Sequence, residues 1–263
     1  QAHARSPRGG ATGARRLAAI QMTKSPDTRY FGDFEGAPIT VCWTARKKSI
    51  ALSVRDGAIV ILSPMHVSDG EIDALIATNA DWVRGKLAKQ AETKKRTERA
   101  FVDGEQFLYL GEEYPLQVVD GRKALAEFVE GSFVVHASRS QTPERRARSI
   151  RAAFLRWYKS EAETVLTQRV AFFSPRIGRT PKRISFREYR SMWGKCDVEG
   201  RITFNWKLVM APEYILDYVV VHEMVHLHHL NHSPAFWQRV EALLPDYKQR
   251  RKWLKDHGGL LTI

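Results

Sequence analysis

The sequence predicts an α+β fold in which a β-rich N-terminal part packs on a mainly helical C-terminal part. Over much of residues 39–135, apolar residues alternate with polar or small ones between glycine-containing turns. From Thr142 onward, apolar residues recur mostly at helical spacing. The chain has 263 residues, 43% of them hydrophobic, which is enough for one large domain or two small ones.

Residues 1–37 are expected to form a disordered basic tail. The segment is rich in Gly and Ala and lacks the apolar centre of a secretory signal. Met22 is a candidate natural start, which would make the preceding residues an extension. The basic residues that precede the first acidic residue, Asp27, are Arg5, Arg8, Arg15, Arg16 and Lys24.

A β-rich subdomain is expected over residues 38–140. Alternating apolar residues predict strands within 39–62. Ser68 and Glu71 have the spacing of a capping box and predict one helix that continues to about Leu87. A second strand-rich stretch follows over residues 101–135.

A helical subdomain is expected over residues 141–263. Thr142 and Pro143 suit the start of a helix, as N-cap and first-turn residue, and the apolar spacing continues to about residue 170. Strands are predicted near 183–187 and 201–206, and helices follow them to the end of the chain.

Charge and cysteine content limit the classes of partner. The net charge of +13 would attract anions such as nucleic acid, nucleotides or acidic lipid, although it is equally explained by solvation. The two cysteines, Cys42 and Cys196, suit a reducing compartment rather than a disulfide framework. Since no apolar run approaches the roughly 20 residues of a membrane span, we expect a soluble, cytoplasmic protein.

The chemistry is concentrated in the run His222-Glu223-Met224-Val225-His226. On a helix expected over residues 212–230, residues four apart lie on one face, so both imidazoles can reach one cation. Glu223 would then accept a proton from a metal-bound water, as in zinc hydrolases of the His-Glu-x-x-His type. The alternatives are a satisfied core histidine beside a surface glutamate, or a strand over residues 218–221 that would break the spacing.

A third ligand is needed, because catalytic zinc has three protein ligands and an open position. His228 points away from the face of the first two histidines, and His229 lies a further turn along it. Asn231 can end the helix in a left-handed cap and turn the chain, so that His232 folds back toward the metal. We therefore predict His232 as the third ligand.

These motifs resemble the YgjP-like family of metallopeptidase domains, relatives of the SprT-like zinc proteases. The resemblance is strongest over residues 183–257 and implies a zinc site formed by His222, His226 and His232, with Glu223 as the catalytic residue. The segments that carry it are Ser191–Cys196, Asn205, Asp217–Glu223 and Asn231–Trp237.

One loop departs from the family pattern. The usual Arg-Trp-Gly-Ser-Cys is here Met192-Trp193-Gly194-Lys195-Cys196, so an arginine is lost and a lysine is gained. We expect substrate contacts from Arg190, Trp193 and Lys195.

Three functions follow from this site. The first is a zinc-dependent metallopeptidase. The second is a nucleoside-triphosphate pyrophosphohydrolase, because a bacterial member of the resembled family is described as a UTP pyrophosphatase and residues 181–207 hold seven basic against three acidic residues. The third is a DNA-associated SprT-like protease or nucleic-acid-binding module, for which the sequence offers no recognised DNA-reading motif. The sequence leaves the oligomeric state open.

Overall fold

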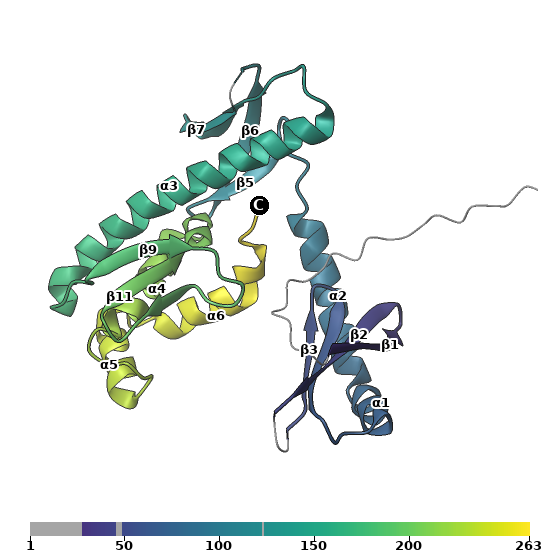
Figure 1. Cartoon of the computed structure of the whole chain (residues 1–263). Coiled ribbons are helices and arrows are strands. Elements are labelled where there is room, and N and C mark those ends of the chain that lie inside the picture. The colour runs from purple at the N-terminus through teal and green to yellow at the C-terminus, as the bar shows by residue number, and fades with distance from the viewer. Residues whose placement is uncertain (1–27, 46–48, 123) are drawn as a thin grey trace, which may run out of the picture. The chain divides into compact units, whose positions relative to one another are not determined.

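The computed structural model describes residues 28–45, 49–122 and 124–263. The chain divides into two compact units, Gln1–Ala91 and Glu92–Ile263 (Figure 1). Strands dominate the first unit, helices and two further sheets form the second, and the predicted α+β class is confirmed. No helix in the described ranges has both the length and the apolar character that a bilayer crossing requires.

The first unit is a four-stranded sheet with two helices. Its strands, in the order β1-β2-β4-β3, are β1 (Thr28–Phe34), β2 (Ala37–Thr44), β3 (Ala51–Arg55) and β4 (Ala58–Pro64). Helices α1 (Asp69–Thr78) and α2 (Ala80–Thr97) follow. The buried residues of this unit come from β2, β4 and both helices, and include Val41, Ile59, Ile61, Ile72 and Val83.

Two expectations for this region differ from the structure. Strand β1 lies within the segment assigned to the basic tail, whose residues 1–27 are outside the described part of the chain. The capping box of Ser68 and Glu71 is present, but the expected single helix is divided at Asn79. The Asn79 side-chain amide donates to the carbonyl of Leu75 at 2.8 Å, which ends α1 before α2 begins.

The second unit begins with another four-stranded sheet, of order β5-β6-β8-β7. Its strands are β5 (Gln106–Tyr109), β6 (Glu112–Val119), β7 (Leu125–Val129) and β8 (Ser132–His136). The long helix α3 (Pro143–Ile177) follows, starting as predicted at the N-cap Thr142 and ending at Gly178, whose φ of 75° suits a glycine. It therefore runs about two turns beyond the expected end.

Aromatic side chains join this sheet to α3. Phe107 of β5 stacks on Phe154 of α3 with ring centroids 4.4 Å apart, and Phe133 of β8 lies 5.1 Å from the same ring. All three side chains are almost fully buried. The sheet therefore belongs to the same compact unit as the C-terminal helices, Glu92–Ile263.

The C-terminal part holds a small sheet and five short helical segments. The sheet, of order β10-β11-β9, comprises β9 (Arg183–Arg187), β10 (Gly194–Cys196) and β11 (Arg201–Asn205). Strands β9 and β11 match the predicted strands, and β10 was not predicted. The helical segments are η1 (Trp206–Met210), α4 (Glu213–Val225), α5 (Pro234–Leu243) and α6 (Tyr247–His257), and η2 (Gly258–Leu260) ends the chain's secondary structure.

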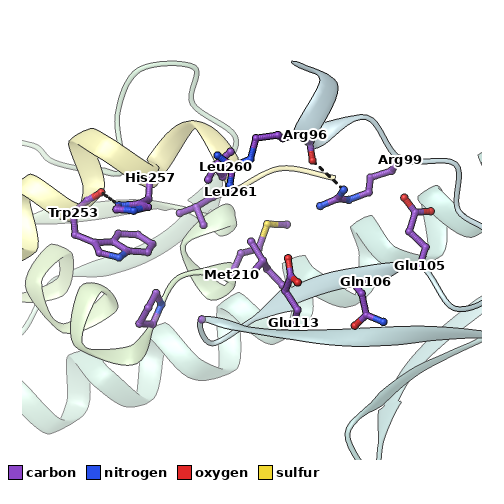
Figure 2. A pocket seen from close by; sticks show the side chains of 13 residues that line it. Arg96, Arg99, Glu105, Gln106, Glu113, Met210, Trp253, His257, Leu260 and Leu261 are labelled. Carbon is purple, nitrogen blue, oxygen red and sulfur yellow. Dashed lines mark hydrogen bonds between the residues drawn. The ribbon is translucent and has the colours of Figure 1, made fainter. Parts of the chain in front are cut away.

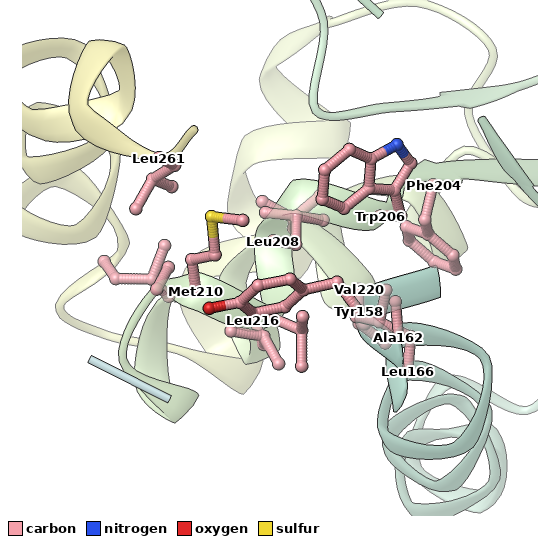
Figure 3. Close-up of a cluster of buried hydrophobic side chains, with 14 of the residues drawn as sticks. Tyr158, Ala162, Leu166, Phe204, Trp206, Leu208, Met210, Leu216, Val220 and Leu261 are labelled. Carbon is pink, nitrogen blue, oxygen red and sulfur yellow. The ribbon is translucent and has the colours of Figure 1, made fainter. Parts of the chain in front are cut away.

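Helix α4 is anchored in the core by one face. Leu216 and Val220 are fully buried, and they lie beside Tyr158 of α3 and the side chains of η1 (Figure 3). Farther along, Arg169 of α3 makes a bidentate ion pair with Asp217, with Nε–Oδ1 and Nη2–Oδ2 distances of 2.5 and 2.8 Å. These contacts fix the rotation of α4 about its axis, and so the direction of its other face.

Candidate metal centre

Two of the predicted ligands lie on the C-terminal turn of α4. His222 and His226 have ring centroids 5.0 Å apart, as expected for residues one turn apart. The regular helix ends at Val225, five residues before the predicted end, but His226 keeps helical dihedral angles of φ −62° and ψ −18°. The spacing of the two imidazoles therefore survives the earlier helix end.

The chain then returns His232 to the first two histidines. The turn begins at His226 rather than at Asn231, and Asn231 is not among the described residues with positive φ, so the left-handed cap predicted there is wrong. His232 Nε2 lies 3.0 Å from His222 Nε2. One ring nitrogen from each of the three histidines lies within 4.8 Å of the others.

A single phenyl ring forms the common wall of this cluster. The ring centroid of Phe236, on α5, lies 5.0, 4.5 and 4.8 Å from those of His222, His226 and His232. Phe236 is fully buried. Contact with all three imidazoles restricts their rotation, so the arrangement depends on packing as well as on chain direction.

Hydrogen bonds select the tautomer of His226. Its Nδ1 lies 2.8 Å from the backbone carbonyl of His229, which can only accept, so Nδ1 carries the proton. The lone pair of Nε2 is then free for a cation. His229 thus contributes its backbone, whereas the ring of His228 contacts the carbonyl of Ile177 at 2.9 Å, at the end of α3.

The donor set fits a divalent cation. The pKa of His222 is lowered to about 3, first by burial and then by His226, His232 and Arg251. Burial also lowers the pKa of His226. Neutral imidazoles are the form that binds metal, and two nitrogens on one tetrahedral zinc would lie about 3.3 Å apart. The buried Nδ1 of His222 has no partner among the described residues, so the polar contact of this ring is the one toward His232.

The predicted catalytic carboxylate lies on the same helix. Glu223 is 6% exposed and is hydrogen-bonded by the backbone of Cys196 on β10. Burial raises its pKa to about 8, against the opposing effect of that hydrogen bond. A carboxyl group with a pKa near neutrality can accept and return a proton during a reaction.

A comparison with protein-family models identifies the chain. The model for the YgjP-like metallopeptidase domain matches residues 48–257. The chain belongs to the YgjP-like family. The match confirms the resemblance seen in the motifs, and it supports a metallohydrolase of the metallopeptidase type, a class that uses a divalent metal.

Other comparisons add little to the family assignment. Among solved structures, the metallopeptidase zymogen abylysin of Pyrococcus abyssi is 22% identical, over 36% of this chain and 93% of that chain, with a TM-score of 0.30. No match was found among curated proteins.

In this YgjP-like chain, Glu223 lies directly over Gly194. A Cβ atom at Gly194 would approach Cγ of Glu223 to 2.5 Å and Oε1 to 2.7 Å. Any larger residue would therefore displace the carboxylate. The sequence analysis placed Gly194 only within a loop, because its contact partner, Glu223, lies 29 residues away on another element.

Asn205, at the end of β11, holds the loop before Gly194. Its side-chain Nδ2 donates to the carbonyls of Tyr189 and Met192 at 3.0 and 3.1 Å, and its backbone N–H donates to Trp193 at 2.8 Å. Asn205 is only 2% exposed. A buried amide with these partners makes the loop a fixed wall of the site.

A pocket of about 340 Å³ opens beside His222 and Glu223. Of the three residues expected to contact substrate, Trp193 lines this pocket, and Arg190 and Lys195 are not among its lining residues. Lys195 alternates along β10 with Gly194, which faces Glu223, so its side chain is directed to the opposite face of the sheet. The other residues that line the pocket are Met192, Gly194, Tyr218, Val219, Arg251, Leu254 and Lys255.

The sequence analysis missed the cationic side of this pocket. Arg251 and Lys255 lie on α6, about 30 residues beyond the histidine motif. Their spacing of four residues, which places both on one helix face, is the sequence signal that could have paired them.

A second cavity, of about 380 Å³, lies elsewhere in the same compact unit. Figure 2 shows its lining, which includes Arg99, Glu113 and the stacked rings of Trp253 and His257. Neither Glu223 nor any of the three clustered histidines lines it. Cavity size alone therefore does not locate the site.

Proposed function

We propose that this chain is a zinc-dependent peptidase in which His222, His226 and His232 hold the metal and Glu223 is the general base. One observation carries the proposal: three imidazole nitrogens lie within 4.8 Å of one another, beside a buried carboxylate. Burying such groups is unfavourable unless they are paired or bind an ion, and a nitrogen-only donor set suits zinc.

The residues around the metal would divide the chemistry between them. When bound, the cation polarises the carbonyl under attack and lowers the pKa of a coordinated water. Glu223 removes a proton from the attacking water and delivers it to the leaving amine, because it lines the same pocket as His222 and burial raises its pKa to about 8. The Cys196 backbone and Gly194 hold that carboxylate in place.

The edge of the small sheet favours a peptide substrate. Strand β10 is an edge strand, and its pairing with β11 uses the carbonyl of Trp193 and the N–H of Asp197. In an antiparallel pair, the backbone N–H and C=O groups of successive residues point alternately toward the partner strand and away from it. The backbone groups of Gly194 therefore point away from β11, to the open edge of the sheet next to Glu223. An extended peptide can pair with such an edge and bring its carbonyl to the metal.

A nucleoside-triphosphate pyrophosphohydrolase is the alternative use of the same centre. The observation that favours it is the pair of cations, Arg251 and Lys255, in the pocket beside His222. Guanidinium and ammonium groups bind phosphate well. DNA association remains a prediction from the net charge.

The experiment compares the two substrate classes directly. Unfolded casein and, separately, UTP are incubated with zinc-loaded protein, with and without a chelator, alongside Glu223→Gln and the exposed control Glu241→Gln. We expect peptide fragments that disappear with the chelator and fall about 10²- to 10⁴-fold in Glu223→Gln, with the control unchanged. Zinc content, measured for each variant, shows that the centre is intact.

Two outcomes would contradict the proposal. Pyrophosphate release that depends on Glu223, without casein cleavage, would establish the nucleotide alternative. If Glu223→Gln retains both casein cleavage and pyrophosphate release, this carboxylate is not the base.

A further inference from the structure

The pocket beside His222 and Glu223 has an apolar floor and a cationic side. Met192, Trp193, Val219 and Leu254 supply apolar surface. Trp193 is held in place by Gly258, where a Cβ atom would approach the indole Cζ2 to 2.7 Å. Its volume of about 340 Å³ is at the small end of ligand sites, which suits one or two amino-acid side chains.

Arg251 and Lys255 are cations without a carboxylate partner. Their neighbours on α6 are paired: Arg250 Nε lies 2.9 Å from Asp246 Oδ1, and Lys252 Nζ lies 2.5 Å from Asp256 Oδ2. Among the described residues, no acidic side chain lies within ion-pair distance of Arg251 or Lys255. The helix thus neutralises its outward cations and leaves the pocket-facing ones available.

The guanidinium of Arg251 is positioned by aromatic packing. It lies 5.2 Å from the ring centroid of Trp237, which stacks in turn on His232. Arg251 lines the same pocket as His222 and Glu223. A cation held over an aromatic ring loses less freedom when it binds an anion.

Tyr218 adds a neutral donor to the same pocket. Tyr218 lines the pocket, and a phenol hydroxyl is protonated at physiological pH and can donate a hydrogen bond. Two cations and one hydroxyl therefore face a space whose one carboxylate, Glu223, is bonded to the Cys196 backbone.

We propose that this pocket binds a carboxylate of the substrate, supplied by an Asp or Glu side chain next to the scissile bond, and so selects acidic peptides. The proposal rests on the proposed peptidase function. Charge-assisted hydrogen bonds from Arg251 and Lys255 would supply the selectivity, and Tyr218 a third donor. The free carboxylate at a peptide C-terminus has the same chemistry, and the test separates the two sources.

The test uses one peptide sequence with blocked ends, carrying Glu, Gln or Lys in turn at the positions that flank the cleaved bond. A fourth peptide carries Gln and a free C-terminal carboxylate. For the zinc-loaded protein, we expect kcat/KM for the Glu peptide to exceed that for the Gln peptide by about 10- to 100-fold. The preference should fall to about 1 in Arg251→Gln/Lys255→Gln.

Matched variants separate recognition from folding. Lys252→Gln changes a cation on another face of the same helix and should keep the preference. Lys255→Gln alone should reduce the preference without disturbing the Trp237 contact of Arg251. Cleavage of the Gln peptide by Lys252→Gln should stay within about threefold of that by the original protein, because Lys252 does not line the pocket.

Failure of this proposal is distinguishable from failure of the peptidase proposal. If peptides are cleaved and Glu is no better than Gln, the acidic specificity is refuted while the peptidase stands. If kcat/KM rises only for the peptide with the free C-terminal carboxylate, the pocket binds a chain end rather than an acidic side chain. If no peptide is cleaved, the affinities of labelled Glu and Gln peptides for Glu223→Gln decide. Equal affinities for the two peptides, or binding of UTP without binding of either peptide, overturn the inference.

Discussion

On one face of helix α4, Leu216 and Val220 are fully buried among the apolar side chains of α3 and η1. On the other face, Glu223 is nearly as buried, at 6% exposure, yet it is ionisable. Of the four buried polar or charged residues in the described part of the chain, Glu223 and His226 lie at the candidate metal centre, and Asn205 holds the loop beside it. The core face stabilises the fold, and the site face costs stability that the core must offset.

The largest effect should come from removing the buried charge. The folded pKa of Glu223 is raised to about 8 from an ordinary 4.5, so between these values the unfolded chain binds fewer protons than the folded one. Below about pH 6.5 the lowered pKa values of His222 and His226 act in the opposite direction, because the unfolded chain protonates these rings more readily. Between about pH 6.5 and 8, stability of the metal-free protein should therefore fall as pH rises, by roughly 1 kcal/mol per pH unit. Glu223→Gln should lower activity about 10²- to 10⁴-fold and remove that slope.

Urea unfolding of the chelator-treated proteins at several pH values measures this. Parallel pH profiles for the original protein and Glu223→Gln would refute the assignment of the slope to this residue.

The next test compares two buried phenyl rings. Phe236→Ala, at the histidine cluster, and Phe154→Ala, in the core, should each cost about 3–5 kcal/mol in the free energy of unfolding. Only Phe236→Ala should also weaken zinc binding, because only its ring touches the three imidazoles. Equal zinc affinity in the two variants, measured by competition with a chelating dye, would show that the chain direction alone positions the ligands. Phe236→Leu provides a milder replacement if folding fails.

A smaller change should act on geometry. Gly194→Ala would displace the Glu223 carboxylate, and we expect kcat to fall about 100-fold with zinc content retained. Gly85→Ala is the control, because no atom lies within 4 Å of its added Cβ in α2. It should leave activity unchanged and raise stability by about 0.5–1 kcal/mol. Unchanged kcat in Gly194→Ala would show that the carboxylate tolerates the shift.

The smallest effect concerns the thiol beside the site. The pKa of Cys196 is raised to about 11 by burial, and then by the charges of Glu223 and Asp197. The thiol should therefore react slowly with iodoacetamide up to about pH 9. Fast alkylation at pH 7, followed by mass spectrometry, would contradict this environment for Cys196.

The sequence was informative where the chemistry depends on local periodicity. His222, Glu223 and His226 are related by helical spacing alone, and the structure places their side chains as that spacing predicts. His232 required a turn, and it lies beside His222 although the turn begins earlier than expected. Metal binding by these residues remains a prediction.

Non-local contacts explain what the sequence left undetected. Strand β10 has only three residues, too few for an alternating pattern, yet it carries Gly194 and the backbone partner of Glu223. Arg190 and Lys195 were expected to contact substrate because they belong to the basic cluster of residues 181–207, whereas the pocket cations come from α6. Pairing a loop with a helix some 60 residues later requires the tertiary fold.

The amide of Asn205 has one further consequence. Because it fastens the main chain of residues 189–193 to β11, the side chains of Met192 and Trp193 project from a backbone that is anchored independently of them. Replacements at these two positions can alter the shape of the pocket while Glu223, the proposed general base, keeps its position. Engineering of altered cleavage preference should therefore begin there, and should leave the amide itself untouched.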